Sequence, residues 1–144
     1  MKEMTVEAKI ENVSLVTEFV EAQLDAMDCP MKIQMKLGIA IDEIFSNIAL
    51  YAYDSQTGEV TIKVEKQEEP MAVKIAFLDK GVPYNPLERE DPDITLSAEE
   101  REIGGLGIYL VKKIMDDVKY EYKDGKNCLT IFKKWNFRGK ENEE

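Results

Sequence analysis

The chain has 144 residues, of which 44% are hydrophobic and 33% charged, and its formal net charge is -10. This composition is typical of one soluble globular domain with a sizeable core, and no apolar run approaches the length of a membrane span. The acidic charge argues against a nucleic-acid binder, because such proteins bind through a basic surface. We expect a single domain over residues 1–136, followed by a polar tail over 137–144.

The absence of histidine and the low number of cysteines limit the kinds of catalytic and metal site that the chain can contain. Histidine is absent, which excludes serine–histidine and cysteine–histidine nucleophile systems and histidine-ligated zinc. Cys29 and Cys128 are too far apart in the sequence to suggest a disulfide framework or a metal knuckle, so both are expected to be reduced thiols in a cytoplasmic protein. The segment after Met1 lacks the long apolar region of a secretory signal, so none is expected.

The chain opens with a predicted strand and a predicted helix. Residues 4–10 alternate between polar and apolar side chains, as a half-buried strand does. A helix is expected over about 13–28, with Asn12 or Ser14 as its cap. Its apolar stripe consists of Val13, Val16, Val20 and Leu24.

A second helix, expected from Met31 to Tyr53, carries two polar residues of interest. Its apolar residues recur at helical spacing, which predicts a helix packed on a sheet. Glu43 and Asn47 lie one turn apart on the shoulder of this stripe. Such a pair suits a general base beside a ligand for a hard cation such as Mg²⁺, although helix surfaces contain many similar pairs. The stripe consists of Ile33, Leu37, Ile41, Ile44 and Ile48.

The second half of the chain predicts two hairpins separated by a loop and a helix. Runs rich in Val and Ile at 59–66 and 71–78 are typical of an antiparallel hairpin. Residues 79–103 lack periodicity, and a loop of this length is usually functional. A helix opening at Gly104 and a hairpin around the Asp-Gly pair at 124–125 complete the domain. This order predicts an α+β two-layer sandwich, with helices on one face of a mixed, mostly antiparallel sheet.

Two short motifs could bind parts of a nucleotide. Asp79 follows a predicted strand and can accept a hydrogen bond from the exocyclic amine of a base, while Gly81 lets a flat base approach the backbone. The glycines at 104–107 can present free N–H groups to a phosphate at a helix N-terminus. Both motifs are also explained by ordinary tight turns. Neither a P-loop nor the motif set of eukaryotic-type kinases occurs in the sequence.

In their order along the chain, these motifs resemble the N, G1 and G2 boxes of the GHKL (Bergerat-fold) ATPases. The match covers about residues 5–135. The stretches D-E-I-F-S-N and D-K-G-V-P-Y-N-P are most similar to those of the anti-sigma factor serine-protein kinases of the RsbW and SpoIIAB type. The resemblance implies ATP and Mg²⁺ as cofactors and phosphoryl transfer to a serine or threonine of an anti-anti-sigma (STAS-type) protein. It also implies a sigma factor as a second partner, and it allows a homodimer.

The resemblance further implies a role for each motif residue. Glu43 would be the general base, and Asn47 would be the Mg²⁺ ligand. Asp79 would accept a hydrogen bond from the adenine amine in a pocket shaped by Gly81. The backbone of residues Gly104, Gly105, Leu106 and Gly107 would bind the phosphates. Gly105 and Gly107 would donate their N–H groups.

The sequence departs from the family pattern in three places. Tyr51 stands where these kinases often carry histidine, and Asn85 replaces a frequent aspartate. The segment 87–103 should be the nucleotide lid, but its only basic residues are Arg89 and Arg101, and the sequence leaves open whether Arg89, Arg101 or neither contacts a phosphate. Three alternatives therefore stay open: a non-catalytic module that binds its partner in a nucleotide-dependent way, a slow ATPase of the same fold, and a purely structural domain.

The predicted lid also contains a pattern similar to a calcium-binding loop. Calcium binding is the less favoured interpretation, because Leu96 stands where the sharp turn of that loop requires glycine. The oxygen-bearing side chains at the ligand positions are Asp91, Asp93, Thr95, Ser97, Glu99 and Glu102.

Overall fold

The computed structural model describes residues 1–53, 57–88 and 105–136, and the predicted helices and strands of these ranges are all present. The predicted tail at 137–144, Gly104, Arg89, Arg101 and the calcium-type pattern lie outside the described residues. The elements are β1 (Lys2–Glu7), η1 (Ile10–Asn12), α1 (Val13–Ala26), α2 (Met31–Tyr51), β2 (Glu59–Glu68), β3 (Met71–Asp79), η2 (Pro86–Glu88), α3 (Gly105–Ile114), β4 (Asp117–Lys123) and β5 (Lys126–Lys134).

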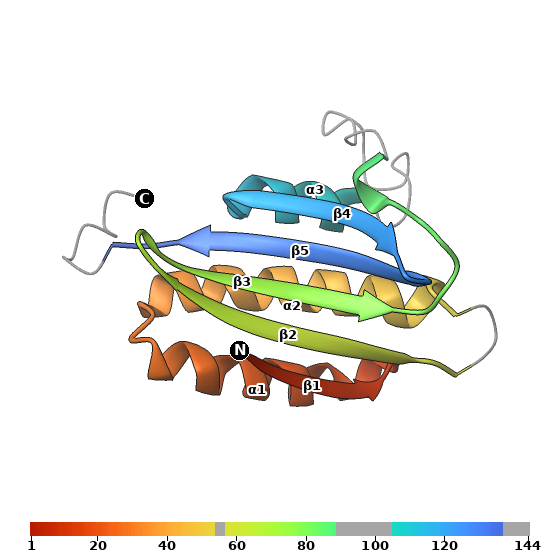
Figure 1. The fold of residues 1–144 in the computed structure, drawn as a ribbon, viewed down its shortest axis with the longest axis horizontal. Helices are drawn as coiled ribbons and strands as arrows, with labels where there is room; N and C mark the ends of the chain where they lie inside the picture. Colours follow the sequence, from red (N-terminus) through yellow and green to blue (C-terminus); the bar gives the residue numbers. More distant parts are fainter. Residues whose placement is uncertain (54–56, 89–104, 137–144) are drawn as a thin grey trace.

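The described strands form one five-stranded sheet in the order β1-β2-β3-β5-β4 (Figure 1). All four strand pairs are antiparallel, so the parallel component of the expected mixed sheet does not occur among the described strands. The last hairpin turns at Asp124 and Gly125, with φ values of 56° and 77°. Positive φ at both positions is the requirement of a type I′ turn, so this predicted turn is confirmed.

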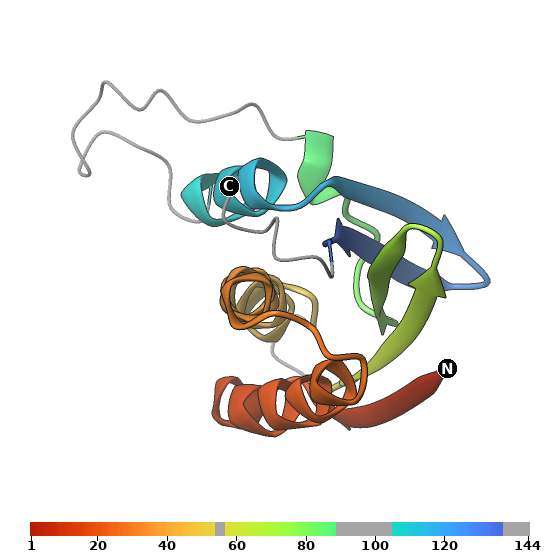
Figure 2. The same cartoon turned by 90° about the vertical axis from the view of Figure 1, so that its left-hand side faces the viewer.

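Within the described residues, the three α-helices lie on one face of the sheet and make a two-layer sandwich, as Figure 2 shows in side view. This arrangement confirms the predicted α+β class with one-sided helix cover. The core lies between the layers and includes Phe45 from α2, together with Ile62, Ile75, Phe77 and Ile131 from the sheet, all of them fully buried. Within the described part of the chain, no helix is both long and apolar enough to cross a bilayer.

The apolar stripe predicted for α2 is the face that packs on the sheet. Ile33, Leu37, Ile41 and Ile44 are each at most 1% exposed, whereas Asp42 is exposed. Burying side chains of this size stabilises the fold by about 1.5–3 kcal/mol each. The orientation of α2 about its own axis is therefore fixed, and with it the positions of the polar residues beside the stripe.

The predicted start of the chain needs two corrections. The first strand spans Lys2–Glu7 rather than 4–10, because the backbone turns after Glu7, whose carbonyl accepts the N–H of Lys9 at 2.8 Å. Asn12 occupies the N-cap position of α1, but its side chain makes no cap hydrogen bond. It donates instead to the carbonyl of Glu7 at 2.9 Å, so it ties the end of the strand to the start of the helix.

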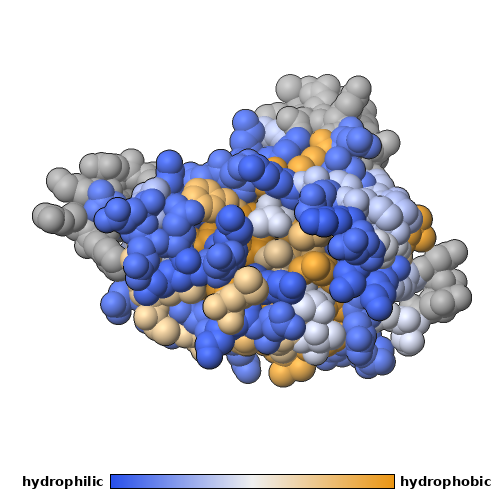
Figure 3. Space-filling model, viewed as in Figure 1, coloured by the Kyte–Doolittle hydropathy of each residue, from blue (hydrophilic) through white to orange (hydrophobic). Residues whose placement is uncertain are grey.

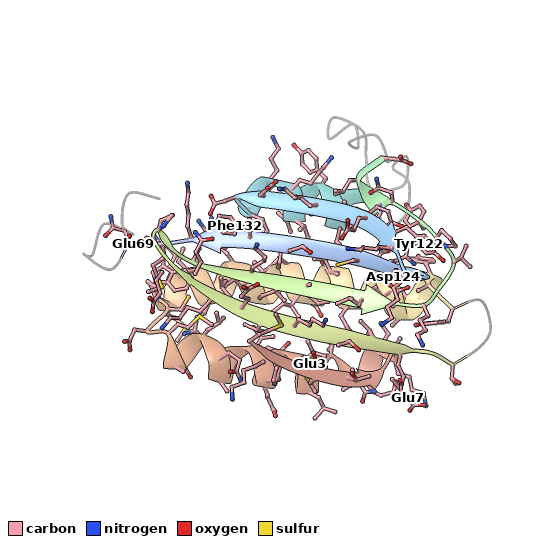
Figure 4. The ribbon with its side chains drawn as sticks, viewed as in Figure 1. Glu3, Glu7, Glu69, Tyr122, Asp124 and Phe132 are labelled. Atoms are coloured by element: carbon pink, nitrogen blue, oxygen red, sulfur yellow. The ribbon has the colours of Figure 1, made fainter. Side chains whose placement is uncertain are left out.

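The opposite face of the sheet carries none of the described helices and faces the viewer in Figure 3, where hydrophilic residues surround a small hydrophobic area. Half-buried Leu78, Cys128 and Phe132 contribute to this face. Figure 4 shows Tyr122 and Asp124 at the end of the sheet where β3 finishes, and Glu69 at the opposite end.

The two cysteines differ in their surroundings, and this difference predicts different reactivity. Cys29 is 6% exposed, and burial, helped by the negative charge of Asp25, raises the pKa of its thiol to about 12. Thiolates are the reactive form of cysteine, so Cys29 should resist thiol reagents even at about pH 9 in the native protein. Half-buried Cys128 should react first, and Cys128→Ser should remove the fast phase in a stopped-flow thiol assay. Two fast phases in the native protein would contradict this assignment.

Candidate functional site

A cavity of about 640 Å³ opens between the C-terminal half of α2, the end of β3 and the start of α3. This volume is in the range of small-molecule sites, which are mostly apolar with a few convergent polar groups. The polar side chains in its wall include Asn47, Asp79, Tyr120 and Asn127. Its apolar wall includes Ile44, Ile48, Phe77, Ile108 and Leu129. The cavity can therefore hold a flat apolar ring with polar groups at its edge.

Two of the predicted site residues reach this region from α2. Asn47 is half-buried and lines the cavity. Glu43, one turn earlier, lies against the first turn of α3, since a Cβ atom added to Gly107 would be 2.2 Å from its Oε1. Only a glycine lets the carboxylate approach the helix backbone this closely. The structure thus brings together Glu43 and the glycine segment, which are far apart in the sequence.

Asp79 ends β3 and points into the same cavity from the sheet. It is 5% exposed, and its Oδ1 accepts the backbone N–H of Gly81 at 2.8 Å and the side-chain amide of Asn127 at 3.0 Å. A buried carboxylate with such partners can accept a further hydrogen bond from a ligand donor. The amine of a purine is a donor of this kind.

The turn after Asp79 is pressed against the end of α2 at Gly81. A Cβ atom at Gly81 would lie 2.3 Å from the carbonyl oxygen of Ala52, which is backbone and cannot move aside cheaply. The same carbonyl accepts the N–H of Val82 at 3.0 Å. Gly81 is therefore required by the close approach of two backbone segments, and through this contact it shapes the cavity wall.

Tyr53 makes a second link between α2 and this turn. Its hydroxyl donates to the carbonyl of Glu59 at 2.6 Å and accepts the N–H of Lys80 at 2.8 Å. Burial raises the pKa of the Tyr53 hydroxyl, so it remains a donor at neutral pH. The side chain joins the end of α2, the start of β2 and the turn after β3.

Asn127 and Tyr120 are site residues that the sequence interpretation did not identify. The hydroxyl of Tyr120 donates to Oδ1 of Asn127, and burial, with the charge of Asp79 adding to it, raises the pKa of Tyr120. Asn127 occupies an inward position of β5, in alternation with buried Leu129 and Ile131. A polar residue at an inward strand position was the signal that could have indicated it.

The glycine segment is described only in part. Gly105 begins α3, one residue after the predicted opening at Gly104, and Leu106 and Gly107 lie in its first turn. The N–H groups of a first turn have no partner within the helix and favour an anion. Gly104 and most of the predicted lid lie outside the described residues.

The oxygen atoms of Asn47 and Glu43 suit Mg²⁺ better than a metal whose ligands all come from the protein. Within residues 1–53, 57–88 and 105–136 there is no group of three or more acidic or cysteine side chains that could hold a metal. Mg²⁺ is commonly bound by one or two protein oxygens together with phosphates and waters. The amide oxygen of Asn47 in the cavity wall, near the carboxylate of Glu43, is such a limited set.

Comparison with known proteins agrees with this geometry. The family model described as the histidine kinase-like ATPase domain matches residues 6–133. The chain belongs to this family. It is 30% identical over 129 residues to "Serine-protein kinase RsbW" of Bacillus cereus, covering 88% of this chain and 81% of that protein. It is 29% identical over 131 residues to the protein of the same name from Bacillus mycoides.

A solved structure supports the fold of this histidine kinase-like ATPase domain. The histidine kinase domain of a blue-light activated histidine kinase from Erythrobacter litoralis superposes with a TM-score of 0.55 at 12% identity. The match covers 85% of this chain and 60% of that chain. The family model confirms the predicted GHKL family and this superposition confirms its sandwich fold, while the roles of individual site residues remain predictions.

The close approach at Gly81 predicts a large effect of one methyl group on stability. In Gly81→Ala the new Cβ would meet the carbonyl of Ala52, so the turn or the end of α2 must shift and the melting temperature should fall by several degrees. The matched control is Gly38→Ala in α2, where a Cβ meets nothing within 4 Å. That variant should be as stable as wild type or more stable, by up to about 1 kcal/mol. Equal melting temperatures for the two variants would contradict the proposed contact.

Proposed function

We propose that this protein is an ATP-dependent serine/threonine-protein kinase that also binds a sigma factor as an anti-sigma regulator. Its phosphoryl acceptor would be a serine or threonine of an anti-anti-sigma protein of the STAS type. Relatives named "Serine-protein kinase RsbW", similar over 88% of the chain, support the kinase assignment. The resemblance of the motifs supports the two partners and a cytoplasmic location. The kinase would consist of one domain over 1–136 with a tail at 137–144.

The observation that carries the proposal is the contact of the Glu43 carboxylate with the first turn of α3, next to a residue that lines the cavity. Its Oε1 lies beside Gly107, and the next residue, Ile108, lines the cavity. Asn47 faces the cavity from the same helix, and Asp79 faces it from the sheet. A nucleotide whose base contacts Asp79 could therefore extend its phosphates toward a carboxylate, an amide oxygen and a helix N-terminus.

Each of these groups has a part in phosphoryl transfer. Glu43 would accept the proton of the incoming hydroxyl, whose oxygen bonds to the γ-phosphorus while the bond from that phosphorus to the bridging oxygen breaks and ADP leaves. Backbone N–H groups at the start of α3 would stabilise the negative charge of the transferred group. Asn47 would hold Mg²⁺, which supplies positive charge to the phosphates when bound.

Transfer of label from γ-labelled ATP to an anti-anti-sigma protein of the STAS type tests the kinase directly. Glu43→Gln should lower the transfer rate by about 10²–10⁴-fold, because the general base is lost, while ADP affinity stays unchanged. The matched control is Asp42→Asn, which removes the exposed neighbouring carboxylate on another face of α2 and should leave transfer unchanged. Phosphoprotein formed equally by Glu43→Gln and wild type would contradict the assignment.

The products of the same assay separate the alternatives. A slow ATPase would release free phosphate without forming phosphoprotein. A non-catalytic module would bind ATP and its partner without either product. Binding of no nucleotide at all would leave only the structural alternative.

The contact between Glu43 and Gly107 predicts a variant that loses activity without losing stability. In Gly107→Ala the new Cβ would lie 2.2 Å from Oε1, and the flexible end of Glu43 must move aside. Misplacement of a catalytic group by about 1 Å can cost about 10²-fold in rate. Transfer should therefore fall by at least about tenfold at an unchanged melting temperature, whereas Gly38→Ala should transfer normally. Normal transfer by Gly107→Ala would contradict a catalytic position of Glu43.

A further inference from the structure

Asn127 is a buried polar residue that the proposed chemistry does not use. It is 6% exposed, it lines the cavity, and in the register of the sheet it lies directly opposite Asp79. A buried carboxamide must find partners for two donor hydrogens and two acceptor lone pairs. Most of its partners belong to the end of β3 and the following turn, which form one wall of the cavity, and a further partner, Tyr120, lies in β4.

The donor side of Asn127 binds the first part of this turn. Its Nδ2 lies 3.0 Å from Oδ1 of Asp79, 3.0 Å from the carbonyl oxygen of Val82 and 3.4 Å from that of Gly81. The two carbonyl oxygens accept hydrogen bonds only, so the amide atom that faces them must be nitrogen.

The acceptor side of Asn127 binds the end of the same turn. The backbone N–H of Tyr84 donates to Oδ1 at 3.1 Å, and the hydroxyl of Tyr120 donates to the same oxygen. A backbone N–H is only a donor, so the orientation of the carboxamide is fixed from both sides. With these partners the hydrogen-bonding capacity of Asn127 is filled, and it has none left for a ligand.

These contacts also determine which carboxylate oxygen of Asp79 is available to accept a hydrogen bond from a ligand. Among the described residues, this carboxylate accepts hydrogen bonds from Gly81 and from Asn127, and both end on Oδ1. Oδ2 is thereby left to accept a donor from the cavity. The carboxylate is held in one orientation from both its own turn and the neighbouring strand.

We propose that Asn127 is a positioning residue for adenine recognition. Supported by Tyr120, it holds the turn after β3 in its binding shape before the nucleotide arrives, and it directs Oδ2 of Asp79 toward the adenine amine. Ordering these groups in advance lowers the entropic cost of binding. The inference rests on the proposed function, since it requires an adenine nucleotide in the cavity.

Substituting an acid for Asn127 turns the hydrogen bond to Asp79 into a repulsion that depends on pH. In Asn127→Asp two carboxylates would face each other, share one proton under acidic conditions and repel each other once it is lost. The other titratable groups around the pair are Tyr120 from β4, Tyr53 from the end of α2, and Glu88 and Tyr122 near Tyr120. Burial raises the pKa of both Tyr53 and Tyr120, so these two hydroxyls stay protonated up to alkaline pH and the new pair should dominate the pH response.

Calorimetric titration of wild type and Asn127→Asp with ADP and Mg²⁺ measures this response. Affinity is expressed relative to wild type at each pH, which removes the titration of the nucleotide itself. The relative affinity of the variant should fall by about tenfold or more between about pH 5.5 and about pH 8.5. The matched control is Gln67→Glu, the same amide-to-acid change at the far hairpin of the sheet, whose relative affinity should stay constant.

A second variant tests the positioning role without adding charge. Tyr120→Phe removes one hydrogen bond from Asn127, and near neutral pH it should lower the preference for ADP over inosine diphosphate by about threefold or more. Inosine carries a carbonyl where adenosine carries the amine, so this preference reports on Asp79. A purely structural role would lower the melting temperature and leave the preference unchanged.

The outcomes separate this inference from the proposed function. A constant relative affinity in Asn127→Asp, or an unchanged preference in Tyr120→Phe, would overturn the role of Asn127 while wild type still binds ADP. Failure of wild type itself to bind ADP would overturn the proposed function and the inference together. If Asn127→Asp does not fold at alkaline pH, the preference of Tyr120→Phe decides.

Discussion

The packing of α2 on the sheet is the constraint on which the geometry of the site depends. Ile33, Leu37, Ile41 and Ile44 are buried together, and a rotation of the helix by a quarter turn would expose them at a cost of about 1.5–3 kcal/mol each. The same burial holds the residues beside the stripe at the edge of the core. Polar side chains placed there reach a cavity without being exposed fully to water.

A second constraint is polar and acts on the other wall of the cavity. The apolar side chains of Val82 and Tyr84 in the turn after β3 are exposed, so their burial does not hold the turn in place. The turn keeps its shape through hydrogen bonds to the elements that surround it. Ala52 and Tyr53 hold it from the end of α2, and Asn127 holds it from β5. Unpaired buried polar groups cost about 1–3 kcal/mol each, so a turn with satisfied partners is well determined. One wall of the site, α2, is therefore held by apolar packing, and the other wall, the turn after β3, is held by hydrogen bonds.

The parts of this structure that local patterns determine could be predicted from the sequence. Helical periodicity places the stripe of α2 and the pair Glu43 and Asn47, and a run rich in Val and Ile places the strand that ends at Asp79. The Asp-Gly pair at 124–125 predicts its turn because only certain residues adopt positive φ at low cost. These features depend on residues close together in the chain.

The remaining parts depend on contacts between distant segments. Asn127 and Asp79 are 48 residues apart and meet because β3 and β5 pair in one particular register, which no local pattern specifies. The same holds for the contact of Gly107 with Glu43, since the sequence indicates a glycine-rich turn but not its neighbour. Asn12 was one of two residues, with Ser14, expected to cap α1, yet the carbonyl of Glu7 offers its side chain a competing partner.

The central claim is that the cavity between α2, the turn after β3 and the start of α3 binds an adenine nucleotide. Thermal unfolding in the presence of ADP and Mg²⁺ tests it most directly, because a ligand specific to the native state stabilises it. At about 100 times the dissociation constant the gain in unfolding free energy should be about 2.7 kcal/mol, and Asp79→Asn should lose most of it. An unchanged melting temperature of wild type at every nucleotide concentration would contradict the claim.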